Sequence, residues 1–365
     1  MNEVFDIAIV GAGIAGASLA AELAPHAQVL LLEAEDQPGY HTTGRSAAFW
    51  SQTYGGPLIQ PLTSASGPWL EEHGFLGARG GLTIARADQL HLLDRFEGQF
   101  RASGVHMERW DRNQMETVVP GLLPAWVASV YEPDSKDIDV GAVFGHYLGL
   151  ARRLGVQVLT RARLASADRA AGGWQLALED GRRFSSKLLV NAAGAWADEM
   201  AQMAGVKPIG IQPLRRTMAQ LRTRPPADPA MPLVLDVAGQ FYFKPEAGRV
   251  WLTPHDETPS PPCDAAPEEL DVAIAIDRFQ GVVDWTVEAV ERKWAGLRSF
   301  APDRLPVFGF ESHAEEFFWF AGQGGFGIQT APAGARLAAQ IILGHEADGL
   351  TERLEKSLYA PSRFR

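Results

Sequence analysis

The chain has 365 residues, of which 46% are hydrophobic, and a formal net charge of -11. This size suffices for a large core and two domains, while the acidic charge argues against nucleic acid and anionic membrane surfaces as partners. No stretch approaches the roughly 18 apolar residues of a membrane-spanning helix, and the acidic residues 1–6 do not resemble a signal peptide. The single cysteine, Cys263, excludes an internal disulfide framework and favours a reducing compartment, so we expect a cytoplasmic protein.

The first elements predicted along the chain form a βαβ unit. Residues 4–10 and 28–32 are short apolar runs of strand length, and residues 17–23 between them have helical character. A G-x-G-x-x-G motif joins the first strand to the helix, with glycines at Gly11, Gly13 and Gly16. These glycines permit a tight turn, close approach of a pyrophosphate and close helix–strand packing. Glu33 ends the second strand, where its carboxylate can accept hydrogen bonds from a ribose, so the unit predicts a dinucleotide site.

The segment after this unit, residues 39–48, is small, polar and rich in hydrogen-bond donors. The glycine motif alone does not separate NAD from FAD. Because the segment directly follows the strand that ends at Glu33, it can run along the second part of a long, two-headed cofactor. A simple structural turn is the alternative interpretation.

Alternating strands and helices are predicted through the middle of the chain. We expect strands at residues 81–86, 156–159, 174–178 and 188–190, and helices at 88–102, from 111, at 139–154 and through Met203. The small residues of the stretch 191–196 follow a buried strand and permit close approach to a nucleotide, although a helix-packing turn also needs them.

The last third of the chain is predicted to contain strands at residues 209–221, 241–252, 291–299 and 317–321. A Pro-rich surface stretch, residues 259–267, contains Cys263, for which we expect neither a metal nor a covalent flavin. The final strand leads through the glycine-rich residues 322–327 to a helix at 333–342. This second strand–loop–helix offers a row of backbone N–H donors, which the oxygens of a flavin ring need.

Seven separated segments together resemble the superfamily of D-amino-acid oxidases and dehydrogenases, which are FAD enzymes, and within it the bacterial D-arginine dehydrogenases. They are residues 11–18, 37–48, 189–196, 213–217, 241–245, 294–300 and 323–330. The resemblance implies an α/β (α+β), two-domain fold. It assigns residues 1–80, 141–210 and 299–365 to a Rossmann-type FAD-binding domain, and residues 81–140 and 211–298 to a mostly antiparallel β substrate-binding domain.

The motifs and the resemblance together give a set of residues expected to hold FAD without a covalent bond. Arg163 is expected to act through its backbone near the adenine, and residues 324–329 to line the isoalloxazine. The full set is Gly11, Gly13, Ala15, Gly16, Glu33, Ala34, Thr42, Thr43, Gly44, Arg45, Ser46, Ala47, Ala48, Phe49, Arg163, Ala193, Gly194, Trp196, Gly324, Gly325, Phe326, Gly327, Ile328 and Gln329.

An amino acid substrate carries a carboxylate, which a bidentate guanidinium binds well. Arg298 matches the family position for this clamp, Tyr242 can donate its phenol to the same carboxylate, and Arg216 matches a second active-site arginine. For each arginine the alternative is a surface ion pair or a structural cap. Tyr54 lies in a glycine-flanked loop that, by resemblance, closes over substrate, and Gln329 completes the candidate catalytic set.

The resemblance implies oxidation of a D-amino acid by hydride transfer to flavin N5. Water then hydrolyses the imino acid to a 2-oxo acid and ammonia. The sequence shows no compelling general base, which leaves water as an alternative to the phenols of Tyr54 and Tyr242. The sequence leaves two properties open. The electron acceptor is oxygen or a quinone (or dye), and the protein is a monomer or a homodimer.

The chain departs from the D-arginine dehydrogenases in the expected pocket for the substrate side chain. Their glutamate for the substrate guanidinium falls on Gly81, and Phe49 and Ser51 also differ from their counterparts, while Arg79 adds positive charge nearby. An unpaired buried guanidinium is costly. We therefore expect a neutral, hydrophobic D-amino acid rather than D-arginine or D-lysine.

Two other functions fit part of the pattern. A flavin enzyme for a secondary amine or 2-hydroxy acid, of the sarcosine, glycine or L-2-hydroxyglutarate type, would also use an arginine clamp. A flavin-binding protein without redox turnover, such as an FAD-stabilised tRNA-modification subunit, fits the acidic charge less well.

Overall fold

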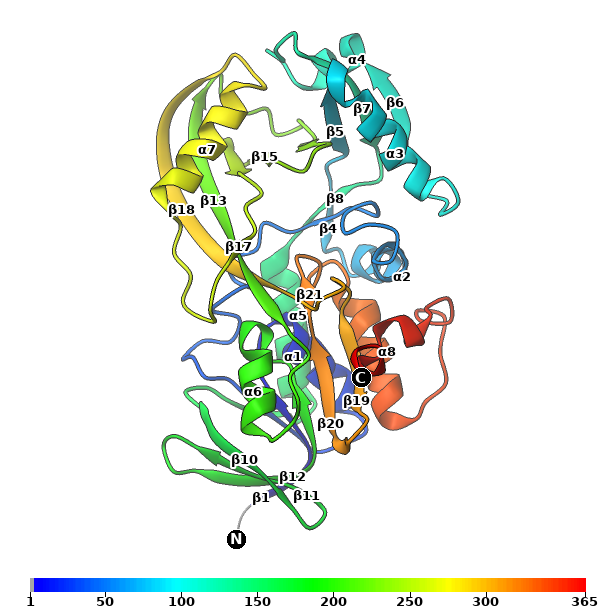
Figure 1. Cartoon of the computed structure of the whole chain (residues 1–365), viewed down its shortest axis with the longest axis vertical. Helices are drawn as coiled ribbons and strands as arrows, with labels where there is room; N and C mark the ends of the chain where they lie inside the picture. The colour runs from blue at the N-terminus through cyan, green and yellow to red at the C-terminus, as the bar shows by residue number, and fades with distance from the viewer. Residues whose placement is uncertain (1–2) are drawn as a thin grey trace.

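The computed structural model describes residues 3–365; residues 1 and 2, which the sequence analysis places in the first FAD segment, lie outside that range. The described elements form an eight-stranded sheet, a ten-stranded sheet and a three-stranded sheet. Figure 1 shows the eight-stranded sheet and its helices at one end of the molecule and the ten-stranded sheet at the other. This mixed architecture confirms the predicted fold class.

The eight-stranded sheet has β1 at its centre, paired in parallel with β2 and β12. Its strands are β1 (Glu3–Val10), β2 (Val29–Leu32), β9 (Gln157–Leu159), β10 (Leu164–Ala170), β11 (Gly173–Leu178), β12 (Arg183–Asn191), β19 (Val307–Glu311) and β20 (Ala314–Ala321). Alternate side chains of β1 face opposite ways: Ile7 and Ile9 join one apolar core, and Ala8 between them joins another. The sheet is therefore covered on both faces.

Different helices cover the two faces of this sheet. The core that contains Ile7 and Ile9 also contains residues of α1 (Ile14–Leu23), α5 (Val140–Arg153) and α8 (Ala331–Leu343). The opposite core contains residues of α6 (Ala197–Met203). The arrangement places the N-terminus of α1 at the carboxyl ends of β1 and β12, where open α/β sheets bind ligands.

The ten-stranded sheet is antiparallel except for the β5–β14 pair. Its strands are β5 (Gly81–Arg86), β6 (Glu108–Asp111), β7 (Trp126–Glu132), β13 (Gln212–Arg224), β14 (Leu233–Asp236), β15 (Tyr242–Glu246), β16 (Arg249–Thr253), β17 (Thr258–Pro259), β18 (Thr286–Phe300) and β21 (Gln323–Gly324). The helices α3 (Leu90–Phe100), α4 (Arg112–Val118) and α7 (Glu269–Gln280) contact it. The long strands β13 and β18 reach from this sheet toward the other half of the molecule (Figure 1).

A small sheet of β3 (Phe49–Trp50), β4 (Leu76–Ala78) and β8 (Lys136–Ile138) lies with α2 (Gln60–Glu72) between the two larger sheets (Figure 1). The predicted strand at residues 241–252 is a β-hairpin of two strands, β15 and β16. Because β21 belongs to the glycine-rich loop and pairs with β18, the C-terminal segment also joins the ten-stranded sheet. The domain boundaries expected from the sequence stay a prediction.

The helices of the described chain include no candidate for a membrane span. Within residues 3–365, none is both long enough and apolar enough to cross a bilayer.

Candidate active site

The first glycine loop forms a cradle that admits no side chains at two positions. Gly11 has a φ of +100°, and a Cβ there would lie 2.4 Å from the carbonyl oxygen of Ala192. A Cβ on Gly16 would lie 1.8 Å from the carbonyl oxygen of Gly11. The backbone of the loop therefore lies directly against the ends of β1 and β12, and Ile14 and Ala15 at the start of α1 lie on the open side.

Side chains from the neighbouring strand and loop complete this cradle. The Glu33 carboxylate accepts hydrogen bonds from the backbone N–H groups of Ala12 and Glu35, each at 3.0 Å. The Thr43 hydroxyl accepts from the N–H of Ile14, also at 3.0 Å. Glu33 is thus fixed beside the loop, at the end of β2, where a ribose would lie.

An open cleft runs from this cradle to the ten-stranded sheet. Most residues predicted from the sequence line it: Gly11, Gly13, Ala15, Glu33, Thr42, Thr43, Arg45, Ser46, Ala47, Ala48, Phe49, Tyr54, Ala193, Gly194, Trp196, Arg216, Tyr242, Arg298, Gly324, Gly325, Gly327, Ile328 and Gln329. The cleft is also lined by residues of segments that were expected to run along the cofactor, namely Gly39, Tyr40, His41, Ala192, Ala195, Gly322 and Gln323. Five further lining residues had no predicted role in the cleft: Ile14, Met218, Gly296, Leu297 and Ser299. Most of these flank predicted motifs, and the alternation of β13 places Met218 on the face of Arg216.

Five residues expected to contact the cofactor lie outside this lining: Gly16, Ala34, Gly44, Arg163 and Phe326. Gly16 and Gly44 are needed for close backbone packing, since a Cβ on Gly44 would lie 2.8 Å from the carbonyl oxygen of Gly39. Phe326 packs against Tyr54 behind the cleft surface, and the Arg163 side chain pairs with Glu35 at 3.4 Å. The contacts of these five residues with the cofactor stay predictions.

The loop of residues 39–48 ties the cofactor end to the ten-stranded sheet. The guanidinium of Arg45 donates to the carbonyls of Ala265 and Ala295 and forms an ion pair with Asp264. The Thr42 hydroxyl donates to the carbonyl of Leu297 at 2.6 Å. The two halves of the cleft are thus held together by the segment that also lines it.

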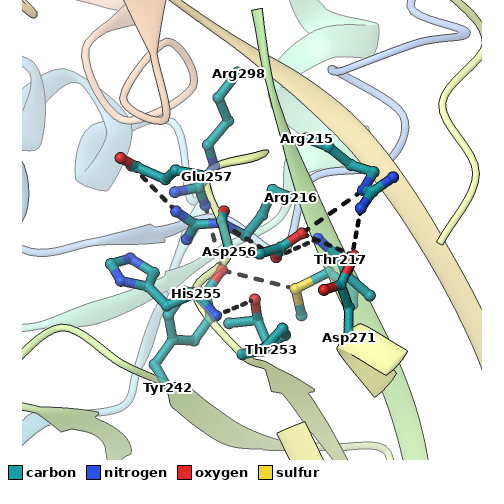
Figure 2. Close-up of polar contacts among 12 residues, drawn as sticks. Arg215, Arg216, Thr217, Tyr242, Thr253, His255, Asp256, Glu257, Asp271 and Arg298 are labelled. Carbon is teal, nitrogen blue, oxygen red and sulfur yellow. Dashed lines mark hydrogen bonds and ion pairs between the residues drawn. The ribbon is translucent and has the colours of Figure 1, made fainter. Parts of the chain in front are cut away.

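Sheet register brings the candidate substrate residues together at the other end of the cleft. Leu214 of β13 lies opposite Arg298 of β18, so Arg216, two residues further along, projects from the same face. Tyr242 of β15 faces this pair in Figure 2. The Arg298 guanidinium donates to the phenol oxygens of Tyr54 at 2.6 Å and Tyr242 at 3.4 Å.

Arg216 is buried with one nitrogen that has no protein partner. Its Nε donates to the carbonyl of Asp256 at 2.7 Å, and its Nη2 lies 3.4 Å from the Glu257 carboxylate (Figure 2). Within residues 3–365, its buried Nη1 has no hydrogen-bond partner. Burial, and then the charge of Arg298, lower the pKa of Arg216 below its ordinary value. An anionic ligand in the cleft would satisfy this group.

The two phenols beside Arg298 differ in acidity. Burial raises the pKa of Tyr242 above its ordinary value. Burial acts in the same direction on Tyr54, but the charges of Arg298 and Arg216 outweigh it and lower the pKa of Tyr54. Tyr54 is therefore the more acidic of the two hydroxyls that face the cleft.

Gln329 holds the loop that carries Tyr54. Its Nε2 donates to the carbonyl of Tyr54 at 3.2 Å and to the Thr63 hydroxyl at 2.9 Å, and its Oε1 accepts from the N–H of Ser51 at 3.4 Å. Gln329, predicted as a catalytic residue, thus lines the cleft, but its side-chain amide is already hydrogen-bonded to Ser51, Tyr54 and Thr63.

The structure does not assemble the predicted side-chain pocket of Phe49, Ser51 and Gly81, because only Phe49 lines the cleft. A Cβ on Gly81 would meet the Ser135 hydroxyl at 2.9 Å rather than open space. Arg79, which lies near Gly81 in the sequence, is engaged elsewhere in the protein. Its guanidinium pairs with Asp137 and donates to two backbone carbonyls, so its charge is matched.

His255 lies against the ring of Tyr242, with ring centres 5.7 Å apart (Figure 2). Its Nδ1 donates to the carbonyl of Gly239 at 2.6 Å, so the proton of the neutral ring is on this nitrogen. Burial, and then the charges of Arg216 and Arg298, lower the pKa of His255 to about 3. Across the described residues, no group of three or more His, Cys, Asp or Glu side chains is placed to hold a metal ion.

The fold and the cleft define a two-part, dinucleotide-binding protein whose cleft ends at two arginines, the buried Arg216 and the half-buried Arg298. The model of the FAD dependent oxidoreductase family (DAO) matches residues 6–341, and the chain belongs to this family. Its cofactor is FAD. The glycine cradle, the N-terminus of α1 and Glu33 fit the pyrophosphate and ribose of this cofactor.

Curated relatives extend the family across different activities. The chain is 24% identical over 376 residues to the bifunctional protein ThiO/ThiG of Synechocystis sp., covering 100% of this chain and 55% of that protein. It is 27% identical over 271 residues to L-2-hydroxyglutarate dehydrogenase of Salmonella houtenae, covering 63% of this chain and 60% of that protein. The chain thus spans little more than half the length of these relatives.

Solved structures match the fold over nearly the whole chain. L-proline dehydrogenase from P. horikoshii superimposes with a TM-score of 0.86 at 22% identity, covering 100% of this chain and 98% of that one. Glycine oxidase from Geobacillus kaustophilus superimposes with a TM-score of 0.84 at 20% identity, covering 99% of each chain. At these identities the likeness establishes the shared fold.

Proposed function

We propose that the protein is an FAD-dependent dehydrogenase or oxidase that deaminates D-amino acids to 2-oxo acids and ammonia. The observation that carries the proposal is the environment of Arg298 at the inner end of the cleft. Its side-chain partners there are two phenols rather than a carboxylate. Because a buried guanidinium is best matched by a carboxylate, this arrangement supports a substrate with that group.

The residues around Arg298 suit the chemistry of an amine donor. When bound, FAD supplies the acceptor for the two electrons that leave the substrate. Arg298 and Tyr242 hold and orient the carboxylate, and Tyr54 closes the site above it. The positive charges of Arg216 and Arg298 disfavour a protonated amine, so they favour the neutral amine that oxidation requires.

A neutral side chain fits the rest of this end of the cleft. Phe49, Tyr54, Met218 and Tyr242 form one apolar cluster there. The only acidic side chain among the described lining residues is Glu33, which lies at the cofactor end. A basic substrate side chain would thus lack a carboxylate partner, which supports a hydrophobic D-amino acid over D-arginine or D-lysine.

The direct test is anaerobic mixing of the holoenzyme with single amino acids while flavin absorbance is followed. We expect D-leucine, D-phenylalanine and D-methionine to bleach the flavin faster than D-arginine and D-lysine, and L-enantiomers to leave it oxidised. Faster reduction by D-arginine would overturn the side-chain preference. No reduction by any D-amino acid would overturn the proposed reaction.

A second candidate is the oxidation of a secondary amine or a 2-hydroxy acid. The unpartnered Nη1 of Arg216 favours it, because a second cation can take the distal carboxylate of a dicarboxylic hydroxy acid. The likeness to L-2-hydroxyglutarate dehydrogenase supports the same idea. Adding sarcosine, glycine, L-proline and L-2-hydroxyglutarate to the screen separates the two functions.

The remaining parts of the proposal concern the acceptor, the assembly and the location. We propose oxygen or a quinone as acceptor and a cytoplasmic monomer or homodimer, in keeping with a single, exposed cysteine. Admitting air, or a water-soluble quinone, to the reduced enzyme identifies the acceptor. Light scattering on the holoenzyme gives its mass in solution.

A further inference from the structure

Glu132, the last residue of β7, is a buried carboxylate that the proposed chemistry does not use. The residue is 5% exposed to solvent. It accepts from the N–H of Gln52 at 2.8 Å, the Thr53 hydroxyl at 2.6 Å and the Ser51 hydroxyl at 3.1 Å. All three donors thus come from consecutive residues of one loop.

No cation balances this carboxylate among residues 3–365. Burial raises the pKa of Glu132, even though the hydrogen bonds from Thr53, Gln52 and Ser51 act in the opposite direction. A buried carboxylate without a cation costs stability, and an apolar side chain of similar size would avoid that cost. The arrangement therefore points to a role other than stability alone.

Glu132 is a carboxylate that lies beside Gly81 but outside the cleft. It lies directly opposite Gly81 in the β5–β7 register, the position where the sequence comparison located a missing glutamate. Its oxygens already accept three hydrogen bonds from the loop, and it does not line the cleft. Glu132 is thus committed to the protein rather than to a ligand.

The loop that Glu132 holds leads directly to Tyr54. From the other side, Gln329 binds the carbonyl of Tyr54 and the N–H of Ser51. The residues that follow, Gly55 and Gly56, have φ values of +102° and +88°. The N–H of Gly56 donates to the carbonyl of Thr53 at 3.1 Å, so the turn after Tyr54 is also tied to a residue that Glu132 holds.

We propose that Glu132 is a positioning residue that holds residues 51–53 and thereby fixes Tyr54 against Arg298 for capture of the substrate carboxylate. The inference rests on the proposed function of Arg298 as the carboxylate clamp. These contacts start at Glu132 in β7 of the ten-stranded sheet and pass through the loop after β3 to Tyr54. They end at Arg298 in β18 of the same sheet. The substrate end is thus closed by a loop whose anchor lies outside the cleft.

The test uses benzoate as a carboxylate probe, titrated into the holoenzyme while flavin absorbance is followed. Glu132→Leu removes all three hydrogen bonds at similar volume, and we expect the Kd for benzoate to rise about tenfold. Glu132→Gln keeps the shape and the N–H acceptor, and the two hydroxyls can turn to accept from its amide, so it should restore near-native binding. A native Kd in Glu132→Leu overturns the proposal.

A double-mutant cycle separates positioning from general damage. Tyr54→Phe should weaken benzoate binding, and adding Glu132→Leu to it should weaken binding no further, because both changes act on the same contact. With Tyr242→Phe the effects of Glu132→Leu should add. Additivity with Tyr54→Phe contradicts the inference.

Turnover gives an independent readout. With the D-amino acid that reduces the flavin fastest, Glu132→Leu should raise KM about tenfold while kcat at saturation changes by less than about twofold. If Glu132→Leu loses its flavin, the double variant Ser51→Ala with Thr53→Val removes two of the three donors from the loop side and should raise KM in the same way. An unchanged KM in that variant overturns the inference.

Asp198 offers a matched control. Its half-buried carboxylate accepts from the N–H groups of residues 209–211, and burial raises its pKa, but neither it nor that loop lines the cleft. Asp198→Leu should lower Tm without changing the Kd for benzoate. If instead neither Tyr54→Phe nor Arg298→Ala changes benzoate binding, the carboxylate clamp itself is wrong, which is a separate failure.

Discussion

The two ends of the cleft are built in different ways. The cofactor end is made by backbone, in two glycine-rich turns and the N–H groups of α1, with little space for any Cβ. The substrate end is made by side chains, since Arg216, Tyr242 and Arg298 come from three strands and Tyr54 comes from a loop. Binding at the cofactor end depends on the backbone conformation, whereas binding at the substrate end depends on which side chains the strands and the loop place there.

This difference explains why the family keeps one cofactor across many activities. A backbone cradle tolerates few changes, because a Cβ at Gly11 or Gly16 would overlap a carbonyl oxygen. The inner face of the ten-stranded sheet can change one side chain at a time without loss of the fold. The comparison predicts that variants at the two ends fail in different ways.

The largest effect is expected at the cofactor end. Gly16→Ala places a Cβ 1.8 Å from the Gly11 carbonyl oxygen, so we expect protein without flavin absorbance or no folded protein at all. Gly145→Ala in α5 is the matched control, because nothing lies within 4 Å of its Cβ, and it should keep both flavin and Tm. A Gly16→Ala enzyme that keeps flavin absorbance and activity would contradict this difference between the two ends.

A loss of turnover with the flavin retained is expected at the substrate end. Arg298→Ala removes the clamp for the carboxylate, and kcat/KM should fall about a thousandfold. The absorbance spectrum and the flavin content should match those of the parent. Loss of FAD from this variant would show that the two ends are not independent.

A smaller effect is expected from Glu311 in the cofactor half. Burial acts in the opposite direction, but hydrogen bonds from Arg365 and Trp319 lower the pKa of this carboxylate to about 2. A lowered pKa stabilises the fold above the ordinary value of 4.5, and this stabilisation is lost as pH falls toward 2. Glu311→Gln should cost about 2–3 kcal/mol at pH 7 in chemical denaturation, with the difference shrinking below pH 4.5.

The smallest effect at neutral pH is expected from His255 in the substrate half, because its lowered pKa affects stability only in acid. Its pKa of about 3 lies below the ordinary 6.5, so the unfolded chain binds a proton that the folded chain does not. The fold therefore loses stability as pH falls below about 6.5. His255→Asn tolerates the φ of +57° and should reduce the difference in Tm between pH 7.5 and pH 4.5. An unchanged difference would remove His255 from the account of acid sensitivity.

The cofactor end was predictable because its signals are local. The strand, the glycines at Gly11, Gly13 and Gly16, the helix and Glu33 lie within one short segment, and the structure places them at one strand edge. The second glycine loop was predicted for the same reason. By contrast, α7 was missed, because the alternating Val272, Ala273, Ile274, Ala275 and Ile276 give no clear helical period.

The substrate end was predictable only through its resemblance to a family. Pairing of β13 with β18 brings Arg216 and Arg298 to one face, and no local pattern specifies that register. No local sequence pattern indicated the role of Glu132, since its three donors lie about eighty residues earlier in the chain. The partner of Arg79 was unpredictable for the same reason, because Asp137 is distant in sequence.

The glycine-rich loop near residue 324 has a consequence for how the protein is made. It lines the same cleft as Gly11, and β20, which leads into it, pairs with β12. A ribosome releases the N-terminal end first, so the cleft is incomplete until the residues of this loop have emerged, more than 300 residues after Gly11. FAD therefore meets a finished binding site only after this loop has been made, and a chain interrupted before it lacks part of the flavin site.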